Sequence, residues 1–412
     1  MKNEQNAPKI RFKGFTDAWE LRKFSDLCSM FTDGDWIEAK DQSTEGVRLI
    51  QTGNVGVTQY LDKPNNAKWI SEDTFSRLKC EEIFEGDILI SRLPDPAGRA
   101  CIMPNLGTKM ITAVDCTIVR TLPDVNSEYL VQYLSTERYF KEINACLAGG
   151  TRQRVSRGNL AEFDIPLPNS SDEQRQIGTY FRNLDHLITL HQRKCETLKK
   201  LKKSMLQKMF PKNGSHFPEI RFAGFTDAWE QRKFSDFTFP AGERNKDDLD
   251  LEPFAITSNQ GFIAQSEAHD DFGYMKDVDR KMYIVVKPNS FAYNPARINV
   301  GSLGYYEGAE NVIVSSLYEV FQTAEYVDDK FLKHWFKTKA FQDWIERLQE
   351  GSVRLYFYYD KLCECIMSMP SVEEQRKIGA YLDKIDNLIT LHQRKLETLK
   401  KLKKAMLQKM FI

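Results

Sequence analysis

The chain has 412 residues, of which 41% are apolar and 12% aromatic, so it can form two or three packed domains. Its 58 basic and 58 acidic residues balance, which excludes net charge as a guide to partners. The eight cysteines are scattered, and no signal peptide, membrane-spanning run or lipidation motif is present. We therefore expect a protein with free thiols in a reducing cytoplasm, away from membranes.

Two stretches of the sequence occur twice. Residues 8–26 match residues 218–236 at 16 of 19 positions. Residues 188–209 match residues 389–410 at 20 of 22 positions. Each half of the chain therefore begins and ends alike, which indicates a tandem duplication. Between these matching frames the two halves do not resemble each other residue by residue.

The interior of the first half predicts a mixed α/β domain. Short runs rich in β-branched residues, separated by turn residues, predict strands at 47–51, 87–91, 100–103 and 117–121. An amphipathic pattern then predicts one helix over 127–147, which ends before Gly149 and Gly150.

The interior of the second half has the same order of elements. Strands are predicted at 254–257, 282–286, 312–315 and 318–321, and one helix over 328–348, closed by Gly351. A polar linker at 212–215 separates the halves. The sequence therefore predicts two α+β domains, each followed by a long helix.

The long helices extend over residues 172–209 and 373–410, where apolar residues recur at steps of three and four for more than four heptads. At ~1.5 Å per residue each helix is roughly 57 Å long, too long for the interior of one small domain. Duplicated core helices are the simpler interpretation, but the sustained seam favours two helices that pair with each other. The apolar seam positions of the first copy are Ile177, Phe181, Leu184, Ile188, Cys195, Leu198, Met205 and Met209.

Charge favours antiparallel pairing of these helices. Residues 191–212 carry eight Lys and Arg against one Glu, so parallel pairing would place two basic ends side by side. Antiparallel pairing instead sets each basic end beside a segment that holds Asp185, or Asp383 and Asp386.

Arginine, glutamine and asparagine recur beside turns in both domains. Arg binds guanine or phosphate with two hydrogen bonds and Gln or Asn binds adenine, so these clusters suit DNA. A solvated turn is the commoner explanation of any one cluster, but their recurrence in both halves favours DNA binding for the group. The candidates are Gln51, Thr52, Asn54, Ser91, Arg92, Arg99, Thr151, Arg152, Gln153, Arg154, Asn259, Tyr293, Asn294, Arg297, Ser352 and Arg354.

The sequence contains no recognisable catalytic motif. It has no phosphate-binding Gly-x-x-x-x-Gly-Lys-Ser/Thr loop and no acidic cluster with nuclease spacing. Residues 294–297 differ from the Asn-Pro-Pro-Tyr/Phe motif of adenine methyltransferases, since Arg297 replaces the aromatic residue that would stack on a flipped base. The six histidines have no metal-ligand spacing. We therefore expect no catalytic, cofactor or metal site in this chain.

Taken together, the chain resembles the specificity (S) subunits of type I restriction-modification systems. The resemblance rests on the Pro-to-Gln-Arg segments at 168–175 and 370–376, the Gly-Thr-Arg and Gly-Ser loops before them, and the duplicated helices. The stretches at 49–54 and 291–297 also contribute. It covers essentially the whole chain.

This resemblance implies two target-recognition domains, 1–171 and 213–372, joined by two spacer helices, 172–212 and 373–412, with pseudo-twofold symmetry. It implies a non-catalytic subunit that reads an asymmetric bipartite site in double-stranded DNA. The implied partners are two methyltransferase subunits and motor-nuclease subunits, which would hold S-adenosylmethionine, ATP and Mg²⁺.

Two other classes of protein remain open at this point. A scaffold would use its heptads to assemble chains and its domains to bind other proteins. A self-contained methyltransferase or nuclease would need catalytic motifs that we do not find.

Overall fold

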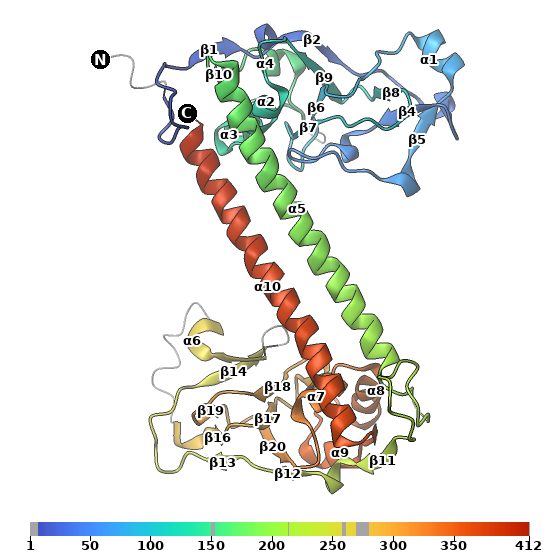
Figure 1. Ribbon diagram of the computed structural model, residues 1–412, viewed down its shortest axis with the longest axis vertical. Helices are drawn as coiled ribbons and strands as arrows, with labels where there is room; N and C mark the ends of the chain where they lie inside the picture. Colours follow the sequence, from blue (N-terminus) through green and yellow to red (C-terminus); the bar gives the residue numbers. More distant parts are fainter. Residues whose placement is uncertain (1–6, 150–152, 213, 258–260, 269–279, 412) are drawn as a thin grey trace. The chain divides into compact units, whose positions relative to one another are not determined.

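The computed structural model describes residues 7–149, 153–212, 214–257, 261–268 and 280–411. The chain forms two compact units (Figure 1). The first unit comprises Met1–Gln192 and Arg394–Ile412, and the second comprises Arg193–Gln393. Two long helices, α5 (Ser171–Lys208) and α10 (Val372–Met410), each contribute residues to both units.

The first unit contains two four-stranded sheets and a strand pair. One sheet is antiparallel, in the order β2 (Cys28–Asp33), β9 (Cys116–Thr121), β6 (Ile88–Ser91) and β7 (Ala100–Ile102). The other has the order β3 (Gln42–Ser43), β5 (Lys68–Ile70), β4 (Val47–Ile50) and β8 (Met110–Thr112), with β4 and β8 parallel. The pair is β1 (Glu20–Lys23) with β10 (Asp164–Leu167). The helices are α1 (Glu72–Leu78), α2 (Ser127–Tyr133), α3 (Glu137–Ala145) and α4 (Arg157–Ala161).

The second unit repeats the main sheet and the strand pair. Its four-stranded sheet has the order β12 (Thr238–Pro240), β20 (Glu319–Thr323), β17 (Ser290–Tyr293) and β18 (Leu303–Tyr306), and its pair is β11 (Glu230–Lys233) with β21 (Ile366–Met369). A second sheet has the order β13 (Glu243–Arg244), β16 (Ile284–Val286) and β19 (Val312–Val314), and β14 (Phe254–Thr257) pairs with β15 (Gly261–Ala264). The helices are α6 (Gln265–Ala268), α7 (Asp329–Trp335), α8 (Lys339–Leu348) and α9 (Tyr359–Glu364).

The helix predicted at the end of each domain is two helices in the structure. Residues 127–147 form α2 and α3, and residues 328–348 form α7 and α8. Thr136 and Thr338 each start the second helix, because each hydroxyl accepts a hydrogen bond from the backbone N–H three residues later. Such a threonine is a helix N-cap, which the apolar periodicity did not reveal. The prediction of one continuous helix is therefore wrong in both domains.

The long helices pair in antiparallel fashion within each unit. In the first unit, Lys403 of α10 donates to Asp185 of α5 at 2.6 Å. In the second, Lys202 of α5 contacts Asp386 of α10 at 2.5 Å. None of the eight apolar seam positions predicted for the first long helix is exposed. The prediction that each basic helix end faces acidic residues of the other helix is confirmed.

The repeated segment at the start of each half holds the end of one long helix. Ile10 N–H donates to the carbonyl of Lys409, and Arg11 forms two hydrogen bonds to Glu173, whose side chain is 1% exposed. In the second unit, Ile220 and Lys208 are joined in the same way, and Arg221 binds Glu374. These bonds explain why the two segments are nearly identical, since each satisfies a helix C-terminus and a buried carboxylate.

The residues that end the long helices enter the cores of the domains. Phe411 lies among Trp19, Tyr129 and Phe181, with ring centroids 5.4–6.4 Å apart. Phe210 lies against Trp229 and Phe331 in the second unit. Each domain core is therefore completed by aromatic residues from the end of a long helix.

The glycine near the start of each long helix allows close packing on the domain. A Cβ atom at Gly178 would lie 2.7 Å from the backbone nitrogen of Tyr129, and one at Gly379 would lie 2.8 Å from that of Phe331. Both distances are too short for a side chain. The glycines that interrupt the predicted helices therefore bring α5 onto α2 and α10 onto α7.

Candidate nucleic-acid interface

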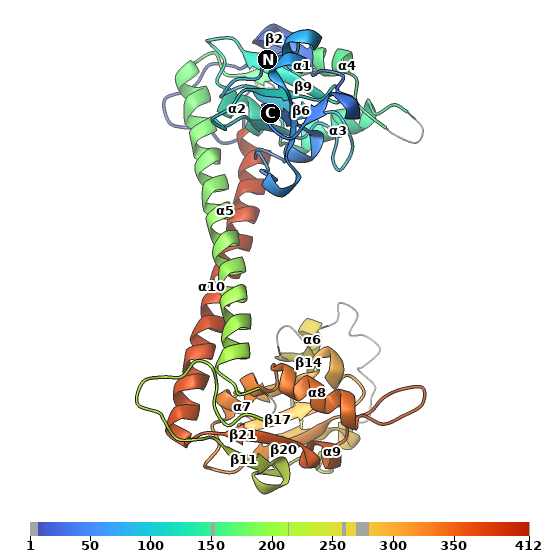
Figure 2. The ribbon, with the colours of Figure 1, turned by 90° about the vertical axis from the view of Figure 1, so that its right-hand side faces the viewer.

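In the second unit, the loop between α8 and α9 holds two of the predicted DNA contacts, Ser352 and Arg354, both exposed. Figure 2 shows this loop projecting from the body of its domain. Glu350 and Tyr356 close it through two reciprocal backbone hydrogen bonds of 2.9 and 2.7 Å. Gly351 has φ +136°, and a Cβ there would lie 1.9 Å from the carbonyl oxygen of Arg354. The loop shape therefore requires glycine at this position.

A second predicted stretch, Asn294 to Arg297, lies beside the base of this loop. Phe357 N–H, just after the loop, donates to the carbonyl of Pro295 at 3.1 Å. Asn294 shapes the turn, because its side-chain oxygen accepts from the N–H of Ala296 at 3.0 Å. Arg297 is exposed. The structure thus brings together two stretches that are more than fifty residues apart in the sequence.

The first unit builds the same arrangement. Ala148 and Arg154 exchange backbone hydrogen bonds of 3.1 and 2.9 Å, and Val155 N–H donates to the carbonyl of Arg92 at 3.2 Å. Gln153 and Arg154 are exposed, and the Arg154 guanidinium lies 3.5 Å from a carboxylate oxygen of Asp115. Of the remaining candidates in these loops and turns, Thr151, Arg152 and Asn259 lie outside the described residues.

Several candidates of the first unit have their polar groups engaged inside the domain. Arg99 donates to the carbonyls of Thr52 and Val55 at 2.9 and 2.6 Å, and it also donates to the carbonyl of Pro96. Arg92 is 6% exposed and donates to the carbonyl of Val114 at 2.6 Å. Arg99 joins the turn at 51–54 to the loop after β6, and Arg92 joins that loop to the turn after β8. Their direct contact with DNA stays a prediction.

The other inward-facing candidates are polar residues in turns and strands. Asn54 is 5% exposed, accepts from the N–H of Gln51 and donates to the carbonyl of Leu61. Ser91 and Tyr293 are fully buried, and the Tyr293 hydroxyl has no hydrogen-bond partner among the described residues. Burial also raises the pKa of the Tyr293 hydroxyl, so this group stays neutral. Gln51 and Thr52 are half-buried.

Sequence reasoning placed Asp383 and Asp386 beside the basic end of the other long helix, but it missed that α7 joins them in an ion-pair cluster of the second unit. His334 is fully buried and donates from Nε2 to Asp383 at 2.9 Å, while its Nδ1 has no partner among the described residues. Burial lowers the pKa of His334, so its ring is neutral. Burial opposes ionisation of Asp383, but hydrogen bonds from His334 and Lys333 outweigh it and lower its pKa to about 2.

Three residues of this cluster, His334, Asp383 and Asp386, have possible ligand atoms close enough together to hold a metal ion, and in the described part of the chain they are the group that does. The carboxylates of both aspartates already contact ammonium groups, Lys333 at 2.9 Å and Lys202 at 2.5 Å. The cluster therefore acts as a salt-bridge network between helices. Lys330, Lys333 and Lys337, spaced three and four residues apart, were the sequence signal for this face.

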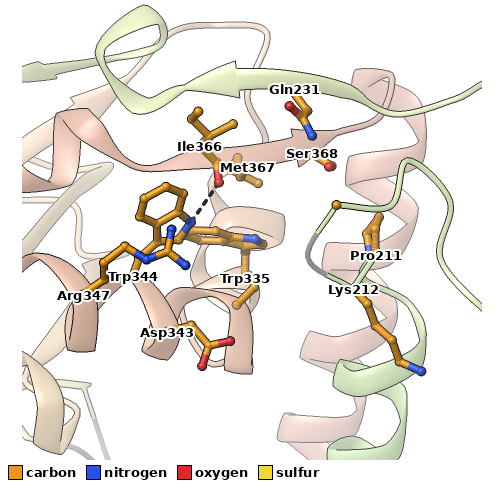
Figure 3. Close-up of a pocket in the computed structure, with 12 residues that line it drawn as sticks. Pro211, Lys212, Gln231, Trp335, Asp343, Trp344, Arg347, Ile366, Met367 and Ser368 are labelled. Carbon is orange, nitrogen blue, oxygen red and sulfur yellow. Dashed lines mark hydrogen bonds between the residues drawn. The ribbon is translucent and has the colours of Figure 1, made fainter.

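A separate pocket of the second unit lies between α8, the strand pair and the start of the linker (Figure 3). Trp344 donates from its indole N–H to the carbonyl of Ile366 at 3.1 Å, and the Arg347 guanidinium lies 4.8 Å from the Trp344 ring centroid. Asp343, which also lines the pocket, pairs with Lys339 at 2.7 Å. The lining residues that the structure describes include no nucleophile paired with a general base.

No helix in the described part of the chain is both long enough and apolar enough to cross a membrane.

Comparisons with known proteins agree with this architecture. A family model described as "Type I restriction modification DNA specificity domain" matches residues 16–200 and 266–401. The chain is 21% identical to the Methanocaldococcus jannaschii protein "Putative type I restriction enzyme MjaX specificity subunit", over 98% of this chain and 95% of the relative. It is 23% identical to the MjaVIII specificity subunit from the same organism, over 61% of this chain and 62% of the relative.

A solved structure has the same fold. It is the crystal structure of the S subunit of a type I restriction-modification system from M. genitalium, with a TM-score of 0.64 at 13% identity, and the match covers 98% of this chain and 99% of that one. The predicted α+β fold with two domains and two long antiparallel helices is confirmed.

Proposed function

Because the chain belongs to the type I restriction-modification DNA specificity family, we propose that each of its two domains recognises one half of an asymmetric bipartite site in double-stranded DNA. The chain is the DNA-recognition subunit of such a system. The observation that carries the proposal is the shared frame of the loops 148–154 and 350–356. Each loop is closed by reciprocal backbone bonds and tied to a turn after a sheet strand, yet the two present different side chains.

The exposed members of these loops and turns are the main candidates for base contacts. They are Gln153 and Arg154 in the first domain and Ser352, Arg354 and Arg297 in the second. Arg and Gln reach base edges with paired hydrogen bonds, whereas a short hydroxyl serves either bases or phosphates. Thr151, Arg152 and Asn259 remain candidates on sequence grounds. The buried residues around Arg99 would support the loop rather than touch DNA.

A domain exchange tests the assignment of half-sites. Replacement of residues 27–150 by those of a relative with a different target should change one half of the methylated motif and leave the other half intact. The motif is measured by direct sequencing of modified adenines in DNA from cells that carry the chain with its methyltransferase. If both halves changed, or neither, the proposal that each domain reads one half-site would be wrong.

Substitution of single side chains tests the candidate contacts. Arg354→Ala and Gln153→Ala should each weaken binding of the target by about 1–3 kcal/mol and relax specificity if the side chains read bases. If they hold phosphates instead, the plot of log affinity against log salt concentration should become shallower by about one unit of slope. Gel-shift titrations over a salt series separate these outcomes. Arg347→Ala is the matched control, because it removes a charge from the pocket of Figure 3.

The catalytic steps would belong to partner subunits. We place S-adenosylmethionine in two methyltransferase subunits, and ATP and Mg²⁺ in motor-nuclease subunits, because the sequence of this chain lacks the phosphate-binding and methyltransferase motifs. Its own role would be to hold the two methyltransferases at the DNA site, in the cytoplasm. A purified chain that methylated DNA without partners would contradict this division.

A scaffold that binds only other proteins is the less favoured function. A scaffold function does not explain why both matched loops expose an arginine, Arg154 in the first domain and Arg354 in the second. It would also use the heptads to join separate chains, whereas α5 and α10 of one chain pair with each other in both units.

A further inference from the structure

The second unit contains a wide open groove of about 1550 Å³ whose lining residues all lie between 199 and 393. One wall is formed by α5 and α10, another by α7 and α8, and the third by β14, β15 and the stretch from Ile298 to Gly308. Seven lysines line it against three acidic residues. The lysines are Lys199, Lys202, Lys203, Lys330, Lys333, Lys337 and Lys339, and the acidic residues are Glu307, Asp383 and Asp386.

Part of this positive charge is not neutralised by the protein. Lys202 and Lys333 are held by Asp386 and Asp383 at 2.5 and 2.9 Å, so they belong to the salt-bridge network described above. Lys199 and Lys203 are exposed and form no ion pair with a carboxylate of the described residues. They lie one helical turn apart on α5, on the same face of the helix.

The groove is continuous with the predicted base contacts of its domain. The turn that holds Asn294 and Arg297 leads directly into Ile298, Asn299 and Gly301, which line the groove. The carbonyl of Pro295 in that turn is bonded to the loop of Arg354. A DNA duplex contacted by these two stretches would therefore have its backbone next to the groove.

The chemistry of the lining suits a polyanion held without regard to sequence. The charged donors are lysines, which act as point charges. The described lining residues include no arginine, whose planar guanidinium would bind a phosphate in one fixed orientation through two hydrogen bonds. Lysines on α5, α7 and α8 are spread over a long open surface, which does not enclose a small anion. Contacts of this type position a duplex through its phosphates and carry no base information.

The matching face of the first unit lacks these lysines, since the positions of Lys330, Lys333, Lys337 and Lys339 hold Glu128, Val131, Ser135 and Glu137. Glu128 and Glu137 occupy the positions of Lys330 and Lys339, and they pair with Arg182 and with Lys404 at 2.9 Å. The face of α2 and α3 is therefore engaged with the long helices. The lysine-lined surface is a property of the second half and does not follow from the common fold.

We propose that this groove binds the sugar–phosphate backbone of DNA, so that the second domain supplies most of the sequence-independent affinity of the chain. This inference rests on the proposed function, because it assumes that the second domain meets DNA. It assigns the two domains unequal energetic roles, although both read a half-site.

The test uses the full chain in complex with its methyltransferase subunits. Lys199→Gln with Lys203→Gln removes two groove charges that pair with no carboxylate in the described part of the chain. The matched control is Lys400→Gln with Lys404→Gln, the same two positions in the repeated sequence of α10, where Lys400 and Lys404 pair with Glu397 and Glu137. Binding of target and non-target duplexes is measured over a salt series.

The groove variant should make the plot of log affinity against log salt shallower by roughly 1.8 units, since each lost phosphate contact changes the slope by ~0.9. The change should be equal for target and non-target DNA, and the methylated motif should stay the same. The control should keep the wild-type slope.

An unchanged slope in the groove variant, or equal changes in both variants, would overturn the inference. If the slope stayed constant while the complex with the methyltransferase subunits dissociated on a sizing column, the groove would be a docking surface for an acidic protein, which also overturns it. These failures differ from failure of the proposed function, in which the wild-type complex itself would show no preference for any DNA site.

Discussion

The helix pair α2–α3 of the first unit and the helix pair α7–α8 of the second have equivalent N-caps but differ in charge. Asn126 and Asp328 cap the first helix of each pair and receive the same hydrogen bond, from Tyr129 N–H and Phe331 N–H. Where the first pair then has Glu128 and Glu137, the second has lysines. The comparison teaches that caps and buried polar contacts hold this fold, while its exposed faces vary freely in charge.

The buried contacts between each long helix and its domain are the part that does not vary. Gln174 accepts from Asn126 N–H at 2.8 Å and donates to the carbonyl of Pro168. Gln375 makes the equivalent bonds to Asp328 N–H and to the carbonyl of Pro370. Each Gln is followed by Arg in the repeated segment, and this dipeptide was one of the motifs that identified the family.

The largest effect is expected from the buried Arg–Glu pairs, which the comparison predicts to be equivalent. Arg11→Ala and Arg221→Ala would leave Glu173 and Glu374, each with a side chain 1% exposed, without their cation. Removal of one partner from a buried pair costs about 3–5 kcal/mol. Hydrogen exchange followed by mass spectrometry, segment by segment, should show this loss in the unit that carries the substitution.

Arg182→Ala is the control for these two variants. Its guanidinium pairs with Glu128 at an exposed position, and such pairs contribute about 0–1 kcal/mol. A loss in Arg221→Ala no larger than in the control would show that the pair does not hold the helix. A large loss in only one of the two units would break their equivalence.

A smaller effect is expected from the salt bridges between the long helices. Lys202 with Asp386, and Lys403 with Asp185, are matched pairs whose lysines are 12–13% exposed and whose aspartates are 27–33% exposed. Partial exposure limits each coupling to about 1 kcal/mol. Double-mutant cycles on both pairs, read from chemical unfolding, measure the couplings. Unequal couplings would show that the neighbouring Lys337 or Gln132 alters one site.

The smallest expected effect concerns pH and the pair His334 and Gln132, which occupy equivalent positions. Burial lowers the folded-state pKa of His334 below the unfolded value of about 6.5. Its contribution to stability is therefore present above that pH and is lost as the pH falls below it, because the unfolded state binds the proton more readily. Asp383, with a pKa of about 2, stays ionised throughout this range.

His334→Gln should remove this dependence, since Gln132 already donates to Asp185 at 2.8 Å without titrating. The unfolding temperature of the wild type should fall relative to His334→Gln between pH 7.5 and 5.5. The reciprocal variant, Gln132→His, should introduce the same trend in the first unit. Parallel curves for wild type and His334→Gln would exclude His334 as the source of any acid sensitivity.

The sequence was informative where a pattern repeats over many residues. The seam and the charges of the long helices predicted antiparallel pairing, and the described contacts of Asp185 and Asp386 confirm it. Each of the eight predicted strand segments overlaps a strand of the structure. The pairing of β1 with β10 and of β11 with β21 was not predicted, because strands that pair across more than a hundred residues leave no local signal.

Prediction of the candidate interface was limited by the difference between chemistry and burial. The sequence identified residues that suit DNA, and several of them meet at the loops of Arg154 and Arg354. It could not show that Arg92 and Arg99 direct their guanidinium groups at backbone carbonyls, because that depends on the folded path of the loop. It also passed over the lysines of α7 and α8, which gain meaning only beside α5.

The first unit is built from two segments that lie on either side of the second unit in the sequence, and this affects how the protein folds during synthesis. Phe411 contacts the ring of Trp19, yet it follows the whole of the second unit in the sequence and is synthesised after it. The intervening unit, Arg193–Gln393, takes about 10–40 s to translate at typical rates. Throughout that interval the nascent first domain has an unfilled aromatic core. We therefore expect the first domain to complete its core only after the second unit has been synthesised.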